Sequence, residues 1–142
     1  PPRPAAHAGH HQMSDAGVRL HRWDEIALEK VTEMISRKVV TGEREMIGQI
    51  YLKRGAIVPM HSHESEQLTY VLQGAMKFLI GCEEITVREG EVLHIPSWVP
   101  HQAEALEDTF EIDLFSPIRQ DWLDGTDNYF NDTPTPGPTS SS

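Results

Sequence analysis

The chain has 142 residues, of which 38% are hydrophobic and 24% charged, which is typical of a single domain with a real core. Its 22 acidic and 12 basic residues give a net charge of −10, which repels phosphate backbones and anionic lipids, so nucleic acid and membranes are poor candidate partners. The sequence has no apolar stretch long enough to span a bilayer, and a single cysteine excludes an internal disulfide, which favours a cytoplasmic location.

The two ends of the chain lack the apolar periodicity of a folded domain. Residues 1–12 are rich in Pro, Ala and His, and we interpret them as a disordered leader or an added remnant. Residues 132–142 are rich in Pro, Ser and Thr and are expected to be disordered as well. We therefore place one domain at residues 13–131, with Trp23–Lys30 as its helical candidate.

From residue 37 onward, short runs of strand-forming residues alternate with turn residues. The first two runs flank Gly42 and predict a hairpin. Short strands at regular intervals are typical of an antiparallel sandwich or barrel, so the predicted fold class is all-β. The strands are expected at Arg37–Thr41, Glu45–Lys53, Ala56–Met60, Leu68–Leu72, Ala75–Ile80, Ile85–Val87, Val92–Ile95 and Phe110–Phe115.

Two histidines, His61 and His63, follow the run Ala56–Met60. Side chains alternate along an extended strand, so both imidazoles are expected on the same face. Imidazole nitrogen suits several divalent metals, among them Zn, Ni, Mn and Fe. The pair alone is a weak signal, because a metal site needs three or four ligands in fixed geometry.

The residues around this pair match two spaced motifs. Residues 55–74 fit G-x5-H-x-H-x3-4-E-x6-G, and residues 90–105 fit G-x5-P-x-G-x2-H-x3-N, with His101 as the third histidine. On these motifs the chain resembles the cupin superfamily over residues 40–117. The resemblance implies a double-stranded β-helix, or jelly-roll barrel. It also implies one divalent metal ion, of undetermined identity, held by His61, His63, Gln67 and His101.

Three residues depart from the motifs. Gln67 stands in place of Glu, Trp98 in place of the second Gly, and Ala105 in place of Asn. The last two concern the shapes of loops, whereas Gln67 concerns the metal itself. A neutral amide would leave the full charge on the ion, which favours Lewis-acid chemistry over oxidation. In the other interpretation, Gln67 points away from the metal.

The last predicted strand carries a candidate acid/base. Alternation places Asp113 and Phe115 on one face, and the other face is plainly apolar, so Asp113 is expected to face the cavity. A carboxylate in an apolar cavity is a general-base candidate. Arg119 either pairs with Asp113, clamps a substrate carboxylate, or plays only a structural part. We interpret the rest of the acidic run Glu104–Asp113 as a solvated face.

The stretch Asp113–Arg119, DLFSPIR, extends the resemblance to the KdgF type of single-domain cupin. That family holds a metal with three His and one Gln, and it opens and ketonises 4,5-unsaturated uronates. The resemblance implies that Asp113 is the acid/base, that Phe115 lines the sugar pocket and that Arg119 meets the substrate carboxylate.

Three functional hypotheses follow. The first is a non-redox metal enzyme, an isomerase or lyase, acting on a small carboxylated sugar. The second is a cupin dioxygenase acting on a small chelating substrate, which oxygen consumption would reveal. The third is a non-catalytic ligand-binding cupin, without turnover. Exposed sheet edges often pair between copies of a chain, so we also expect a homodimer.

Overall fold

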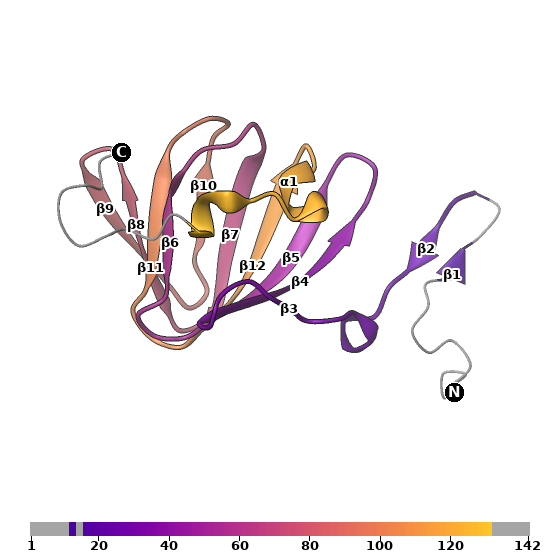
Figure 1. The fold of residues 1–142 in the computed structure, drawn as a ribbon, viewed down its shortest axis with the longest axis horizontal. Helices are drawn as coiled ribbons and strands as arrows, with labels where there is room; N and C mark the ends of the chain where they lie inside the picture. The colour runs from indigo at the N-terminus through magenta and orange to yellow at the C-terminus, as the bar shows by residue number, and fades with distance from the viewer. Residues whose placement is uncertain (1–11, 14–15, 132–142) are drawn as a thin grey trace.

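The computed structural model describes residues 12–13 and 16–131, so residues 1–11 of the expected leader 1–12 and the expected tail 132–142 lie outside the described residues, whereas Gln12 belongs to a short strand. Two antiparallel sheets form the body of the protein (Figure 1). Their inner faces enclose one apolar core, to which strands of both sheets contribute. The expected all-β jelly roll is therefore confirmed. In sheet order, the six-stranded sheet is β10 (Val92–Ile95), β7 (Glu66–Gln73), β12 (Thr109–Ser116), β5 (Met46–Leu52), β4 (Ile35–Thr41) and β3 (Glu29–Lys30), and the four-stranded sheet is β6 (Ile57–His61), β11 (His101–Ala105), β8 (Ala75–Ile80) and β9 (Glu83–Arg88).

The predicted strands differ from the observed ones mainly at their ends. The hairpin at Gly42 is present, with the Gly42 N–H donating to the Glu45 carbonyl between β4 and β5. The strand at His101–Ala105 was missed, because HQAEA carries few strand-forming residues. A short pair, β1 (Gln12–Met13) and β2 (Arg19–Leu20), lies apart from the barrel (Figure 1).

The prediction of a helix at Trp23–Lys30 is wrong. This segment contains one 3₁₀ turn at Trp23–Glu25 and then strand β3, which pairs with the edge of β4. The carboxylate of Glu29 on β3 accepts a hydrogen bond from Nε of Arg37 on β4. Helical periodicity cannot reveal such a contact between strands. The chain ends in α1 (Gln120–Asp124) and a 3₁₀ helix (Asn128–Asn131), and no helix among the described residues is long and apolar enough to cross a membrane.

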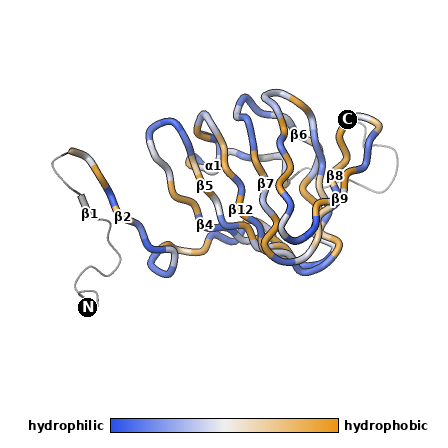
Figure 2. Tube along the Cα trace, turned by 180° about the vertical axis from the view of Figure 1, so that it is seen from behind, coloured by the Kyte–Doolittle hydropathy of each residue, from blue (hydrophilic) through white to orange (hydrophobic). Residues whose placement is uncertain are grey.

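Alternation along β12 turns the candidate site residues Asp113 and Phe115 into the barrel. Hydrophobic and hydrophilic residues alternate along several strands (Figure 2). On β12, Asp113 and Phe115 are buried, whereas Leu114 between them is exposed. The neighbouring strand β7 pairs Thr69 with Asp113 and Gln67 with Phe115. One inner face therefore presents side chains from both strands to the same space.

Two backbone positions fix the loops of the spaced motifs. Gly74 has φ 96°, and a Cβ there would lie 2.8 Å from the Cα of Thr109, so the turn after β7 requires glycine. Trp98 keeps the left-handed conformation, φ 64°, that suits the glycine of the motif. Its N–H donates to the carbonyl of His63 at 2.8 Å, which ties the loop before His101 to the first histidine pair.

Candidate metal centre

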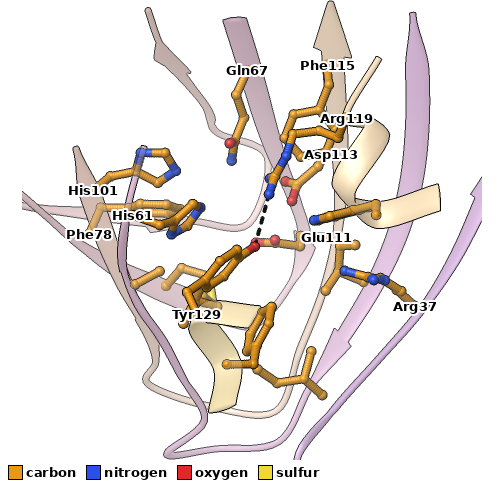
Figure 3. A pocket seen from close by; sticks show the side chains of 17 residues that line it. Arg37, His61, Gln67, Phe78, His101, Glu111, Asp113, Phe115, Arg119 and Tyr129 are labelled. Atoms are coloured by element: carbon orange, nitrogen blue, oxygen red, sulfur yellow. Dashed lines mark hydrogen bonds between the residues drawn. The ribbon is translucent and has the colours of Figure 1, made fainter. Parts of the chain in front are cut away.

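Three histidines converge inside the barrel. His61 ends β6, His63 follows it, and His101 begins β11, directly opposite His61 in the sheet. One ring nitrogen from each histidine lies within 4.8 Å of the other two, and His63 and His101 are buried. In Figure 3, His61, His101 and Gln67 point towards one space. The structure thus brings together the histidines that the two motifs single out.

Each ring is oriented by a backbone carbonyl. The Nδ1 atoms of His61, His63 and His101 lie 2.8, 2.8 and 2.9 Å from the carbonyls of Pro59, Ser65 and Val99. A carbonyl can only accept, so each Nδ1 carries the proton and each Nε2 presents a lone pair. This is the outer-shell arrangement by which proteins aim histidine at a metal.

The site also keeps its histidines neutral. Burial, followed by the charge of His101, lowers the pKa of His61 to about 3. Burial, followed by the charge of Arg119, lowers the pKa of His63 to about 4, and the pKa of His101 is lowered mainly by burial. Neutral imidazole is the form that binds metal. All three lone pairs are therefore available at neutral pH.

Gln67 faces the histidines with its oxygen. Its Nε2 donates to the Thr69 hydroxyl at 2.8 Å, and that hydroxyl donates in turn to Asp113 Oδ1 at 2.8 Å. Since the hydroxyl proton goes to Asp113, the hydroxyl must accept from the amide N–H of Gln67. Gln67 Oε1 is left pointing at His63 Nε2, 3.1 Å away. The sequence left the direction of this side chain open, and the hydrogen-bond chain settles it.

The donor set fits a cation. Neutral His63 with its proton on Nδ1 brings a lone pair on Nε2 to the lone pairs of Gln67 Oε1, and the two atoms repel unless a positive charge lies beside them. The Nε2 of His101 is buried with no hydrogen-bond partner among the described residues. A buried polar atom left unpaired costs about 1–3 kcal/mol. A metal ion at this point would satisfy both observations.

Across the cavity lies a pair of buried carboxyls. Asp113 and Glu111 are on the same face of β12 and are only 6% and 5% exposed. Burial raises the pKa of Asp113 to about 6, offset by hydrogen bonds and by the charge of Arg119. Burial, then the charge of Asp113, raises the pKa of Glu111 well above its usual range. Glu111 therefore holds the proton of the hydrogen bond between them, and its burial contradicts our interpretation of this run as solvated.

The carboxyl pair makes stability depend on pH, and Glu111→Gln isolates the part due to Glu111. The folded wild type holds this proton at pH values where the unfolded chain has lost it, so the contribution of Glu111 to stability falls as pH rises above 4.5. Glutamine keeps the size and a donor but cannot ionise. Each unit of raised pKa is worth about 1.4 kcal/mol. We expect the variant to gain stability over wild type as the pH rises above 4.5.

Thermal unfolding in EDTA at several pH values measures this difference. Glu107→Gln, at an exposed carboxylate before β12, is the matched control and should show no such trend. A Glu111→Gln advantage that stays constant with pH would show that Glu111 is ionised in the folded protein.

Arg119 follows β12 and is 4% exposed. Its Nε and Nη2 donate to the carboxylate of Asp121 at 3.0 and 2.7 Å, so its ion-pair partner is Asp121 and not Asp113. It nevertheless lines the cavity, where its Cζ lies 5.2 Å from the centroid of the Phe115 ring. Phe115 in turn meets His63 edge-on at 5.7 Å. The predicted residues Asp113, Phe115 and Arg119 thus all border the cavity beside the histidines.

Sequence reasoning missed three residues of this site: Thr69, Glu111 and Tyr129. Thr69 orients Gln67, and Glu111 is the member of the carboxyl pair that holds the proton. Tyr129 stacks on His61 with ring centroids 4.2 Å apart. Strand alternation contained a signal for Glu111, two residues before Asp113. No pattern in the sequence connects Tyr129 with a histidine on β6.

Comparison with known proteins places these features in a family. A model of the cupin domain matches residues 48–116. KdgF from Halomonas sp. is 37% identical, with a TM-score of 0.66, over 70% of this chain and 95% of KdgF. An RmlC-like cupin from Shewanella frigidimarina is 23% identical over 72% of this chain and 93% of its own, with a TM-score of 0.68.

Two further proteins are similar to shorter parts of the chain. Oxalate decarboxylase of Bacillus subtilis, which contains Mn(II) centres, is 22% identical over 67% of this chain and 28% of its own, with a TM-score of 0.60. An uncharacterised protein of Methanocaldococcus jannaschii is 24% identical over 75 residues, which are 52% of this chain. The match covers 60% of that relative, so the chain spans less than two thirds of its length.

Proposed function

The chain belongs to the cupin family as a KdgF-like member, and from this premise we propose that it is a metal-dependent, non-redox enzyme. Its substrate would be a small carboxylated sugar such as a 4,5-unsaturated uronate, which it would open and ketonise. The observation that carries the proposal is the buried carboxyl of Asp113, linked through Thr69 to Gln67 and facing the three histidines.

Ring opening and ketonisation of an unsaturated uronate require only proton transfers and the breaking of one C–O bond. The C1–O5 bond of the sugar ring breaks while the anomeric hydroxyl loses its proton, which gives an aldehyde and an enol. The enol then gains a proton at C4, loses its own, and becomes the 5-ketone. Atoms and electrons balance without an oxidant or a reductant. The reaction therefore needs one group that can both accept and return a proton near neutral pH.

Asp113 meets this need. Its pKa of about 6 lies close to neutral pH, where a carboxyl is most effective in moving protons in both directions. The protonated Glu111 holds it by a hydrogen bond, and the Thr69 hydroxyl fixes one of its oxygens. Phe115 forms an apolar wall beside it that limits water. Arg119 places a positive charge at the same end of the cavity.

The metal would be held by His61, His63, His101 and the oxygen of Gln67. These four neutral ligands leave its full positive charge to act as a Lewis acid on a substrate oxygen. Gln67 is itself held by Thr69, so the same hydroxyl positions a metal ligand and the proposed acid/base. Redox-inert and redox-active ions should therefore both support the reaction.

The test is turnover of a 4,5-unsaturated galacturonate by protein reconstituted with Zn, Ni or Mn in the absence of oxygen. We expect the ultraviolet absorbance of the C=C bond to disappear with each metal, and EDTA to abolish the loss. Activity with Fe but not with Zn, or consumption of oxygen, would contradict the proposal and favour a dioxygenase. Ligand binding without turnover would favour a non-catalytic module.

A further inference from the structure

The C-terminal 3₁₀ helix brings Tyr129 to the rim of the metal centre. Its ring is parallel to that of His61, with 3° between the planes and 4.2 Å between the centroids. Its hydroxyl oxygen lies 3.2 Å from Arg119 Nη2, the contact drawn as a dashed line in Figure 3. Tyr129 thus touches one histidine and the arginine across the cavity at the same time.

Arg119 by itself is a weakened site for an anion. Asp121 occupies its Nε and one Nη2 donor and neutralises much of its charge. The Nη1 group makes no hydrogen bond with the described residues. A planar guanidinium can bind a carboxylate strongly through two donors, but here one edge is already taken. A second donor beside the guanidinium would restore two-point recognition.

The Tyr129 hydroxyl can be that donor. Arg119 Nη2 has only N–H groups, so in their contact the tyrosine oxygen accepts. The O–H of Tyr129 therefore stays available, and it donates to none of the described residues. Tyrosine remains protonated at neutral pH, so the hydroxyl offers this proton without any change in charge.

The segment that carries Tyr129 is anchored nearby. The carboxylate of Asp127 accepts from Arg37 Nη1 at 2.8 Å. Arg37 is 2% exposed, is also bound by Glu29, and stacks over Trp122 at 4.1 Å. Because this anchor lies two residues before Tyr129, the hydroxyl is presented in a fixed place. Less ordering is then required when a ligand binds.

We propose that Tyr129 and Arg119 together form the carboxylate-binding end of the site, with the Tyr129 O–H and Arg119 Nη1 each donating to one oxygen of the same carboxylate. The inference rests on the proposed function only in taking the ligand to be a carboxylated sugar. The cavity has a volume of about 40 Å³, room for a few waters, so only the carboxylate would enter beside Tyr129 and Arg119, and the sugar ring would have to displace the neighbouring side chain of Phe130.

The experiment measures binding rather than turnover. Full-length, Zn-loaded protein is titrated calorimetrically with saturated D-galacturonate, which has no C=C bond to react, and with neutral D-galactose. A hydrogen bond to a charged group is worth about 1.5–3 kcal/mol, so Tyr129→Phe should weaken galacturonate binding about tenfold or more. Galactose and Zn binding should not change. Tyr51→Phe, at an exposed tyrosine on β5, is the matched control.

The outcomes separate this inference from the proposed function. Tenfold weaker galacturonate binding by Tyr129→Phe supports the inference even if no unsaturated uronate is turned over. Unchanged affinity overturns it, and so does an absence of galacturonate binding by wild type at millimolar concentration. Tighter binding by the variant also overturns it, because Tyr129 would then occupy the place of the ligand.

Discussion

Asp113→Asn is expected to lower the turnover of an unsaturated uronate by about 10²–10⁴-fold, the usual contribution of a general acid/base. Asparagine has nearly the same shape as aspartate, and its side-chain oxygen can still accept from the Thr69 hydroxyl. That hydroxyl can still accept from the amide of Gln67. The orientation of Gln67 is therefore kept. What is lost is the ability to take up and return a proton, so kcat should fall far more than substrate binding.

Two further measurements make this result specific. The Zn content and unfolding temperature of Asp113→Asn should be at least those of wild type, because the substitution removes a buried ionisable group whose pKa is raised. Asp124→Asn, at an exposed carboxylate on α1, should keep full activity. If Asp113→Asn retains more than a tenth of wild-type turnover, Asp113 does not move the proton and another group must.

The fold and the three clustered histidines were accessible from the sequence because they depend on local patterns. The match to the two cupin motifs singled out His61, His63 and His101, because it added the spacing of a known family to a histidine pair that is a weak signal by itself. Alternation on β12 placed Asp113 and Phe115 in the cavity, because a one-residue shift would turn every side chain outward. The same rule extended by one step would have placed Glu111 beside Asp113.

Other features depend on contacts that no local pattern encodes. The partner of Arg119 is Asp121 because the chain turns into α1 directly after β12. Tyr129 reaches His61 only because the segment after α1 runs back across the barrel to β6 (Figure 1). The orientation of Gln67 is set by Thr69, a residue of ordinary strand type whose role appears only once β7 and β12 are paired.

Removing His101 is expected to have the other large effect. His101→Ala should weaken Zn binding by more than about 100-fold, since loss of an outer-shell partner alone commonly costs 10–100-fold, and should reduce turnover to background. The buried Nε2 of His101 has no hydrogen-bond partner among the described residues, so its lone pair is available to a metal while Nδ1 is held by the Val99 carbonyl. His101→Leu fills more of the space left by the imidazole than His101→Ala does. It therefore separates the loss of a metal ligand from the loss of packing.

The decisive readout is the shift in unfolding temperature on adding Zn. An ion that binds only the folded state stabilises it by about 2.7 kcal/mol at 100 times its Kd. Wild type should therefore gain several degrees, whereas both His101 variants should gain little at the same Zn concentration. His94→Ala is the matched control, because His94 is an exposed strand histidine bound to Glu66. If His101→Leu still takes up one equivalent of Zn with wild-type affinity, the three histidines do not form the metal centre.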